Sequence, residues 1–258
     1  MKIIILAAGK GERLMPLTKN TPKPLLDLGH GATLLEEQIG SLQQSGVVEE
    51  VVLVLGYLAG QVESKLSTFD ARGLRLRSVY NPFYEISNNL MSLWLARDEL
   101  DGDLMITNGD NLFSPDVFRG LAACGDGIHL AINRKSNFDF DDMKITLDGA
   151  VIRRVSKEIS DSEAHGESPG LALVRGRRAQ KLAREQLELL GRRKSSLTQF
   201  WLELFNALYE QGIPVHPWWF DATGRWTEVD FHRDVESLRA LLTAKSRGLK
   251  GTADEEAA

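Results

Sequence analysis

A glycine-rich segment near the start of the chain carries the residues best suited to hold an anion. It runs from Leu6 to Thr18 as LAAGKGERLMPLT and continues to Lys23, which stands between two prolines. Gly9 and Gly11 allow backbone N–H groups to approach an anion closely. Arg13 offers a bidentate fork for phosphate oxygens, and the prolines restrict the backbone of Lys23. Together these residues predict a triphosphate site.

Two common phosphate-binding loops do not fit this segment. A P-loop requires Gly-Lys-Ser/Thr, whereas Gly9-Lys10 is followed by Gly11. A dinucleotide fingerprint requires a third small residue, where this chain has Leu14. The glycine pair is weak evidence by itself, and the whole run through Lys23 is the informative signal.

Two carboxylates follow apolar runs later in the chain. Asp110 comes after Leu104–Thr107 and the Asn-Gly pair, and Asp230 comes after Trp226–Val229. Mg²⁺ is typically held by one or two carboxylates together with phosphate oxygens and water. An aspartate at the end of a strand can also cap a helix, so both interpretations stand at this point.

The elements needed to position these residues alternate between strands and helices in the first half. Apolar runs predict strands at 2–6, 51–55, 74–80 and 104–107, and the first ends at the glycine-rich segment. Helices are expected from Leu34, after a Thr33/Glu36 capping box, from near Asn88, and after Ser114-Pro115. This alternation predicts an α/β fold with a mostly parallel sheet, in which ligands bind at the carboxyl ends of the strands.

The second half is less regular. Runs 143–147 and 151–155 flank Asp148-Gly149, which predicts a β-hairpin. Helices are expected at about 177–190, 197–209 and 231–244, with aromatic side chains of the middle one in the core, and a strand at 214–220. We see no linker, which predicts one domain over residues 1–247 and a flexible tail at 248–258.

Composition excludes several classes of protein. The chain has 258 residues, 43% hydrophobic and 26% charged, which is ordinary for a globular protein. A net charge of −5 disfavours nucleic acid as a partner, although residues 1–24 carry five Lys or Arg and one Glu. One cysteine, Cys124, rules out an internal disulfide, and no run approaches the length of a membrane helix. A cytoplasmic location with no membrane partner is therefore expected.

The segment over residues 6–26 resembles the signature of the sugar-nucleotidyltransferase superfamily, LAAGxGxRLxPLTxxxPKPLL. The resemblance extends to Gly56-Tyr57, Asn88-Asn89-Leu90-Met91-Ser92-Leu93, Gly109-Asp110-Asn111 and Glu228-Val229-Asp230, which are spaced as in the phosphocholine and phosphonate cytidylyltransferase-like branch. Sugar-specific branches usually carry Gln-Pro-x-x-x-Gly-Leu-Ala, and here Asn89 stands near the glycine position. This difference argues against a sugar phosphate acceptor.

The resemblance implies a Rossmann-like three-layer sandwich with a mostly parallel mixed sheet, of the nucleotide-diphospho-sugar transferase type. It also implies that an acceptor phosphate or phosphonate oxygen attacks the α-phosphorus of CTP, with Mg²⁺ as cofactor and pyrophosphate as leaving group. Because the nucleophile is already an anion, no general base is needed, and positioning and charge neutralisation suffice. The site residues implied in this way are Arg13 and Lys23 for catalysis, Asp110 and Asp230 for the metal, and Leu6, Ala8, Gly9, Gly11, Gly56, Tyr57, Asn89 and Ser92 for the nucleotide.

The acceptor site is defined least well. Lys157 matches a lysine that relatives use on the acceptor phosphate, and Arg134 is a second candidate. With Lys135 and Lys144 these residues would suit a small phosphonate, whereas Trp218, Trp219 and Asp221 would suit the quaternary ammonium of phosphocholine. Trp218 and Trp219 are also candidates for a homodimer interface.

The resulting prediction is a Mg²⁺-dependent cytidylyltransferase for a small phosphonate or phosphate monoester. The alternatives are a phosphocholine cytidylyltransferase, a sugar-1-phosphate nucleotidyltransferase using dTTP or UTP, and a nucleotide-binding regulatory subunit without catalysis. A dinucleotide-dependent oxidoreductase is a more distant alternative. The presence of Lys23, Asp110 and Asp230 together argues against a regulatory subunit, since a nucleotide sensor needs only the loop and the base pocket.

Overall fold

One mixed sheet runs through the computed structural model, which describes residues 1–29, 31–71, 73–240 and 242. The predicted tail at 248–258 lies outside these residues, and the single domain over 1–247 stays a prediction. Strands and helices alternate in the first half, as expected. Its elements are β1 (Lys2–Ala7), α1 (Leu34–Ser45), β2 (Glu50–Leu55), α2 (Ala59–Thr68), β3 (Arg75–Tyr80), α3 (Asn89–Leu95), β4 (Leu104–Asn108), β5 (Asn111–Phe113) and α4 (Pro115–Ala122), with short 3₁₀ turns η1 (Glu12–Leu14), η2 (Lys23–Leu25) and η3 (Arg97–Glu99).

The second half adds the antiparallel part of the sheet, including the predicted hairpin at Asp148-Gly149, where Gly149 has a φ of 57°. A helix at 232–240 ends the described chain. The other elements are β6 (Gly127–Asn133), β7 (Lys144–Asp148), β8 (Val151–Ser156), β9 (Gly166–Glu167), β10 (Leu171–Arg175), α5 (Arg177–Gly191), η4 (Lys194–Thr198), α6 (Glu203–Glu210), β11 (His216–Phe220) and β12 (Trp226–Glu228).

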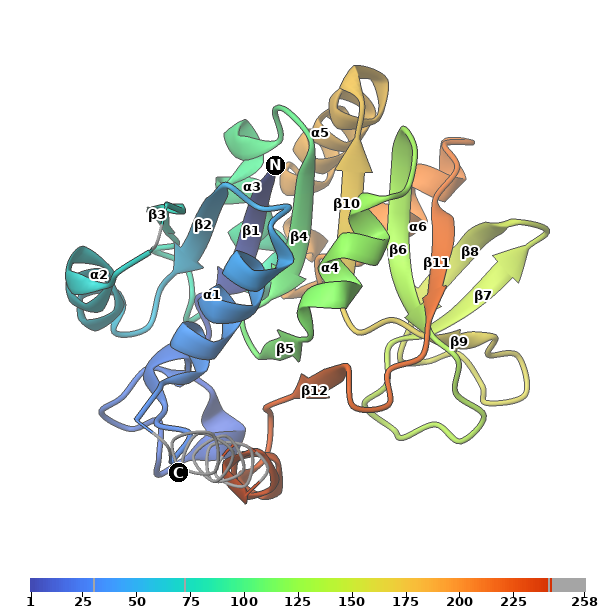
Figure 1. Cartoon of the computed structure of the whole chain (residues 1–258). Coiled ribbons are helices and arrows are strands. Elements are labelled where there is room, and N and C mark those ends of the chain that lie inside the picture. The colour runs from blue at the N-terminus through green and yellow to red at the C-terminus, as the bar shows by residue number, and fades with distance from the viewer. Residues whose placement is uncertain (30, 72, 241, 243–258) are drawn as a thin grey trace, which may run out of the picture.

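The strand order of the large sheet is β3-β2-β1-β4-β10-β6-β9-β7-β8, and β11 pairs with β6. Strands β1 to β4 are parallel, and β10 is antiparallel to both β4 and β6. The β7–β8 hairpin therefore lies at the opposite end of the molecule from β3 (Figure 1). This confirms the predicted mostly parallel mixed sheet.

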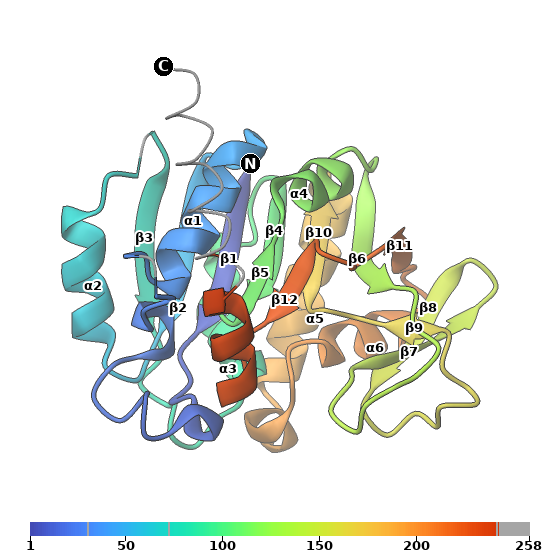
Figure 2. The ribbon, with the colours of Figure 1, turned by 60° about the horizontal axis from the view of Figure 1, so that its bottom comes forward.

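Side chains alternate along each strand and pack into two separate hydrophobic cores, one on each face of the sheet. On β1, Ile4 and Leu6 pack with helices α3, α5 and α6, whereas Ile3 and Ile5 pack with α1, α2 and α4. Helices thus cover both faces of the sheet in three layers, as the two views together show (Figure 2). A third cluster joins Leu14 and Leu26 to Val229 and Leu238, which places the helix at 232–240 beside the N-terminal loop (Figure 1).

Local signals explain where several elements begin and end. Thr33 and Glu36 form the complete capping box before α1, and Gly46 ends the helix in the left-handed conformation at a φ of 70°. Ser114 occupies the N-cap position of α4 but makes no capping bond, since its hydroxyl donates to Asp116. None of the helices in the described residues is long and apolar enough to cross a membrane.

The helix expected over 197–209 is wrong, because the segment divides into η4 and α6 with irregular backbone between them. Trp201 accounts for the break. Its backbone N–H donates to Asn89 Oδ1 at 2.8 Å, and its indole Nε1 donates to Asn108 Oδ1 at 2.8 Å. These bonds hold the segment against α3 and β4, and they leave Phe200 39% exposed instead of in the core.

Candidate active site

A cavity of about 940 Å³ opens at the carboxyl ends of β1 and β4. This is the edge at which ligands of parallel α/β sheets bind. Leu6, Ala8, Gly9 and Gly11 line it from the N-terminal loop, and the antiparallel half supplies the opposite wall. The loop predicted from the sequence therefore lies on this cavity.

Backbone geometry shapes the glycine-rich loop. Gly11 adopts a φ of 64°, and a Cβ there would stand only 3.1 Å from the Thr18 methyl group. Thr18 Oγ1 donates a hydrogen bond to the Gly11 carbonyl at 2.8 Å and so holds the turn. Nothing lies within 4 Å of where a Cβ would project from Gly9, which leaves its backbone open to a ligand.

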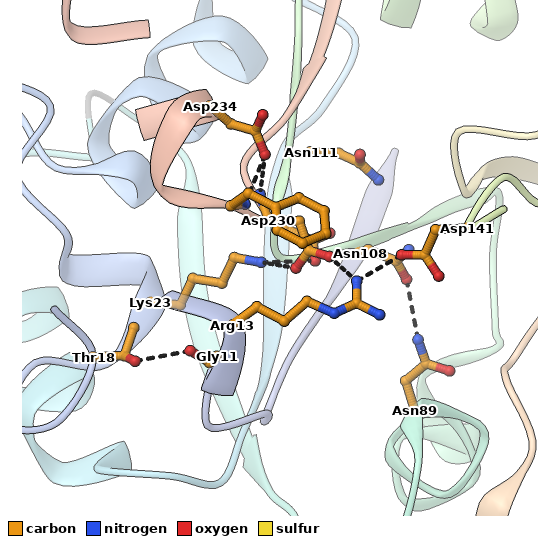
Figure 3. A network of polar contacts seen from close by, with 12 residues as sticks. Gly11, Arg13, Thr18, Lys23, Asn89, Asn108, Asn111, Asp141, Asp230 and Asp234 are labelled. Atoms are coloured by element: carbon orange, nitrogen blue, oxygen red, sulfur yellow. Dashed lines mark hydrogen bonds and ion pairs between the residues drawn. The ribbon is translucent and has the colours of Figure 1, made fainter. Parts of the chain in front are cut away.

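The loop delivers two cations to the cavity. Lys23 begins η2, is 8% exposed, and directs its Nζ to Asp110 and Asp230, at 3.1 Å from each. Arg13 donates from Nη1 to Asp230 and to Asp141, the latter at 2.6 Å. Its guanidinium lies over the Phe231 ring. Figure 3 shows Arg13 and Lys23 both reaching the Asp230 carboxylate. The predicted catalytic and metal-binding residues thus form one cluster.

These contacts fix the charge states of the cluster. Burial lowers the pKa of Lys23, but the charges of Asp110 and Asp230 outweigh it and raise the pKa above its usual value. Burial likewise raises the pKa of Asp230, but Lys23 and Arg13 outweigh it and hold the pKa below its usual value. Asp230 is therefore ionised near neutral pH and available as a ligand to a cation.

Glu228 is a member of this cluster that the sequence did not single out. Its side chain lines the cavity and remains open to solvent on one side. Partial desolvation by the surrounding walls, followed by repulsion from Asp110 and Asp230, raises the pKa of Glu228 to about 8. Like-charge crowding of this kind is relieved by a bound cation. With a pKa of about 8, Glu228 is largely protonated at neutral pH, and a cation bound beside it would favour its ionised form.

The donor set fits Mg²⁺. Asp110 Oδ1 is buried and has no hydrogen-bond partner, so one carboxylate oxygen remains for a cation. Within the described residues, no group of three or more His, Cys, Asp or Glu side chains could hold a metal with protein ligands alone. Mg²⁺ needs only one or two carboxylates when phosphate oxygens and water complete its shell, so Asp110 and Asp230 suffice.

The predicted nucleotide residues divide into two groups. Leu6, Ala8, Gly9, Gly11, Asn89 and Ser92 line the cavity, and Ser92 Oγ accepts a hydrogen bond from Asn81. Gly56 and Tyr57 do not line it, and their contact with the nucleotide stays a prediction.

Gly56 and Tyr57 instead support the wall from behind. A Cβ on Gly56 would come within 2.7 Å of the Ala8 carbonyl oxygen and 2.6 Å of Tyr84 Cβ. Tyr57 N–H donates to the Ala8 carbonyl at 3.0 Å, and its hydroxyl donates to Lys19 O at 2.6 Å. Gly56 is therefore required for close packing behind the loop, since any side chain there would clash with its neighbours.

Sequence reasoning missed an amide-rich wall of this cavity. Asn108 Oδ1 accepts from Asn89 and from Trp201, and Asn81 Oδ1 accepts from the Phe83 backbone. The signal was available, because Asn81 and Asn108 stand at the ends of β3 and β4. The other unpredicted members of this wall are Tyr84, Ser87 and Asn88.

Lys157 lies on the opposite wall, as predicted for an acceptor-binding residue. Its Nζ pairs with Asp141 and lies 4.8 Å from the centre of the Phe200 ring. Asp141 thus contacts both Lys157 and Arg13. Burial raises the pKa of Asp141, but the two cations outweigh burial and hold the pKa below its usual value.

Arg134 does not line the cavity, and its role in acceptor binding stays a prediction. Its guanidinium lies over the Trp219 ring, 4.6 Å from the ring centre. Lys135 lines the cavity in its place and pairs with Asp142 at 2.6 Å and Glu167 at 3.5 Å. Burial and then Asp142 raise the pKa of Glu167 to about 7.

The aromatic residues predicted for a quaternary ammonium group also lie elsewhere. Trp218 stacks on Phe220, and with Trp219 and Asp221 it is absent from the cavity walls. The homodimer interface suggested for the two tryptophans stays a prediction. Lys144 is buried and pairs with Asp161, also away from the cavity. The aromatic side chains that do line the cavity are Tyr84, Phe140, Phe200, Trp201, Trp226 and Phe231.

Comparison with curated proteins gives three informative relatives. CMP-5'-(3-aminopropyl)phosphonate synthase of Streptomyces rubellomurinus is 37% identical over 52% of this chain and 21% of that protein. Choline-phosphate cytidylyltransferase of Streptococcus pneumoniae is 39% identical over 46% of this chain and 48% of that protein. The chain thus spans less than half the length of these two relatives. The 2-aminoethylphosphonate cytidylyltransferase of Lancefieldella rimae is 31% identical over 83% of both chains.

Structural comparison supports the fold. The inositol-1-phosphate CTP transferase from T. maritima superposes with a TM-score of 0.74 at 22% identity, over 93% of this chain and 94% of that one. The predicted nucleotide-diphospho-sugar transferase architecture is therefore confirmed. The family model for nucleotidyl transferases matches residues 2–123, which include Arg13, Lys23 and Asp110. Because this family model matches and the similarity to the Lancefieldella relative extends over most of both proteins, the chain belongs to the nucleotidyl transferase family.

Proposed function

We propose that this protein transfers CMP from CTP to a small phosphonate or phosphate monoester and releases pyrophosphate in a Mg²⁺-dependent reaction. One observation carries the proposal: Arg13 and Lys23 converge on Asp110 and Asp230 at the cavity, and Asp110 keeps a buried oxygen without a partner. This arrangement combines cations for phosphate oxygens with free carboxylate capacity for a metal.

Asp110 and Asp230 would hold Mg²⁺, which when bound supplies charge neutralisation to the triphosphate. Arg13 and Lys23 neutralise the charge that builds on the departing pyrophosphate, and the glycine-rich loop offers backbone N–H groups to its oxygens. An acceptor oxygen forms the new bond to the α-phosphorus as the bond from that phosphorus to pyrophosphate breaks. The acceptor oxygen is already anionic, so no side chain needs to remove a proton from it.

Lys157 and Lys135 are the cations on the acceptor wall, opposite Arg13 and Lys23. Both stand among carboxylates, since Lys157 pairs with Asp141 and Lys135 with Asp142 and Glu167. We propose that Lys157 binds the acceptor phosphonate or phosphate, while Asn89 and Ser92 contact the base. The names of the three relatives, which concern phosphonates and choline phosphate, support this acceptor class.

Phosphocholine is the second candidate acceptor. Phe140, Phe200 and the carboxylates of Asp139 and Asp142 all line the cavity, and aromatic faces with carboxylates suit a quaternary ammonium group. This combination is found on different residues from those that the sequence suggested.

A matrix of pyrophosphate-release assays tests the proposal. CTP, UTP, dTTP, ATP and GTP are each combined with 2-aminoethylphosphonate, carboxyphosphonates, phosphocholine and sugar 1-phosphates, with and without Mg²⁺. We expect release with CTP and a phosphonate, and none after addition of EDTA. A signal confined to sugar phosphates would overturn the acceptor, and nucleotide binding without any release would favour a regulatory subunit.

A further inference from the structure

Asn111 follows Asp110 directly but turns away from the cavity into the protein interior. Its side chain is 2% exposed and makes two hydrogen bonds, and its backbone carbonyl accepts a third from a side chain. Nδ2 donates to Pro169 O at 2.6 Å, and Oδ1 accepts from Trp226 Nε1 at 2.9 Å. The carbonyl accepts from Gln38 Nε2 at 2.8 Å. One residue therefore satisfies partners on three other segments.

These segments carry different parts of the site. Trp226 begins β12, the strand that leads to Asp230, and Pro169 belongs to the loop that forms part of the acceptor wall. Gln38 lies on α1, which packs against the sheet. Asn111 thus connects the strand that follows Asp110, the strand that precedes Asp230 and the acceptor wall.

The backbone alone holds these strands weakly. β5 and β12 form an isolated two-stranded ribbon of three residues each, in which Glu228 pairs with Asn111. A further bond joins Val229 N–H to Asp110 O at 2.9 Å. A two-stranded ribbon is marginally stable by itself, and this one has few backbone hydrogen bonds. Side-chain hydrogen bonds therefore contribute strongly to its geometry. The Trp226–Asn111 bond is such a link.

We propose that Asn111 is a positioning residue that sets the separation of the Asp110 and Asp230 carboxylates and thereby the affinity of the site for a divalent cation. Asn111 is not part of the cavity wall, so it acts through the backbone of β5 and β12. Groups that orient metal ligands in this way typically change metal affinity when they are removed. The inference rests on the proposed function, because it needs Asp110 and Asp230 to bind the cation.

Binding of Mn²⁺, followed by electron paramagnetic resonance with the non-transferable CTP analogue CMPCPP, tests the proposal without turnover. Asn111→Ala is expected to weaken Mn²⁺ binding by about 10- to 100-fold, the range found for groups that orient metal ligands. Ser41→Ala is the matched control, since Ser41 donates from α1 to the Phe113 carbonyl on the same strand β5. It should lower thermal stability as Asn111→Ala does, yet leave Mn²⁺ binding unchanged.

Trp226→Phe provides a second test if Asn111→Ala does not fold. It removes the indole donor while keeping an aromatic ring in place, although a smaller one, and should weaken Mn²⁺ binding by roughly 2- to 10-fold, the equivalent of one hydrogen bond. Trp94→Phe is its control, because the Trp94 indole N–H is buried without a partner, and its Mn²⁺ affinity should equal that of the wild type.

Wild-type Mn²⁺ affinity in both Asn111→Ala and Trp226→Phe would overturn the positioning role and leave the proposed function standing. An equal loss in Ser41→Ala would also overturn it, since any disturbance of β5 would then suffice. A wild-type protein that binds CMPCPP but no Mn²⁺ would overturn the metal-dependent function and this inference with it.

Discussion

Ionic clusters occupy both edges of the parallel strands, and they differ in how completely their charges are paired. At the amino edge, Lys2 bonds to Glu99 and Asp101, and Arg77 bonds to Glu50 and Glu99, at 2.6–3.0 Å. At the carboxyl edge, the cations pair with Asp110, Asp141 and Asp230, while Glu228 and the buried Oδ1 of Asp110 have no such partner among the residues that the structure describes.

This difference indicates separate roles. Surface pairs in which each carboxylate has its cation contribute modestly to stability and present nothing to a ligand. A cluster that crowds carboxyl groups beside a cavity of about 940 Å³, and raises the pKa of one of them, is suited to take up a cation together with an anion. A metal–triphosphate complex has that combination of charges. Variants at the two edges should therefore separate activity from stability.

Asp110→Asn should have the largest effect on activity. Loss of one carboxylate charge removes a proposed metal ligand, and we expect turnover to fall by about 10²- to 10³-fold. The melting temperature should change little, because the amide keeps the shape of the side chain. Steady-state kinetics and thermal unfolding of the same preparation check this, and near-normal turnover would contradict the metal assignment.

Lys23→Met should reduce both activity and stability. The variant leaves Asp110 and Asp230 without their shared cation in a buried position, which is destabilising, and turnover should fall by about 10²-fold. Added Mg²⁺ should raise the melting temperature of the variant more than that of the wild type, because the metal replaces the missing charge. Equal shifts in the two proteins would argue that no cation binds between these carboxylates.

Lys157→Met should affect only the acceptor. We expect the KM for the acceptor to rise by about tenfold, the equivalent of one charge-assisted hydrogen bond, with the KM for CTP unchanged. Arg134→Met is the matched control, since Arg134 stacks on Trp219 outside the cavity. A matching rise in that control would contradict the assignment of Lys157.

Glu99→Gln should have the smallest effect, and only on stability. Hydrogen bonds from Arg77, opposed by partial burial and assisted by Lys2, lower the pKa of Glu99 from 4.5 to about 2. A carboxylate with a lowered pKa stabilises the fold above its unfolded-state pKa and loses this contribution as pH falls through the folded value. The variant should be less stable by up to about 1 kcal/mol at pH 7, after allowance for solvent screening.

The gap in unfolding free energy between Glu99→Gln and the wild type should close as pH falls from 4.5 towards 2. Urea unfolding at several pH values measures it. Activity at pH 7 should be unchanged, and a large loss would mean that the two edges do not have separate roles.

The local sequence determined most of the first half of the fold and one hairpin of the second half. The Ile run of β1, the Thr33/Glu36 capping box and the Asp148-Gly149 turn are signals that act between near neighbours, and each formed the expected element. The glycine-rich segment also predicted Arg13 and Lys23 at one cavity, because a strand in a parallel sheet must deliver its following loop to the carboxyl edge.

Other features were decided only by tertiary structure, since they depend on contacts between residues far apart in the chain. Trp201 breaks the expected helix at 197–209 because Asn89 and Asn108 bind it across the fold. Gly56 leaves the cavity wall because Tyr84 and the Ala8 carbonyl approach it closely. Lys135 lines the cavity and Arg134 lies over Trp219, because after β6 the irregular backbone and the packing of Trp219 decide where each side chain lies. Residue types predicted the chemistry of the site, and long-range packing decided which side chains could reach it.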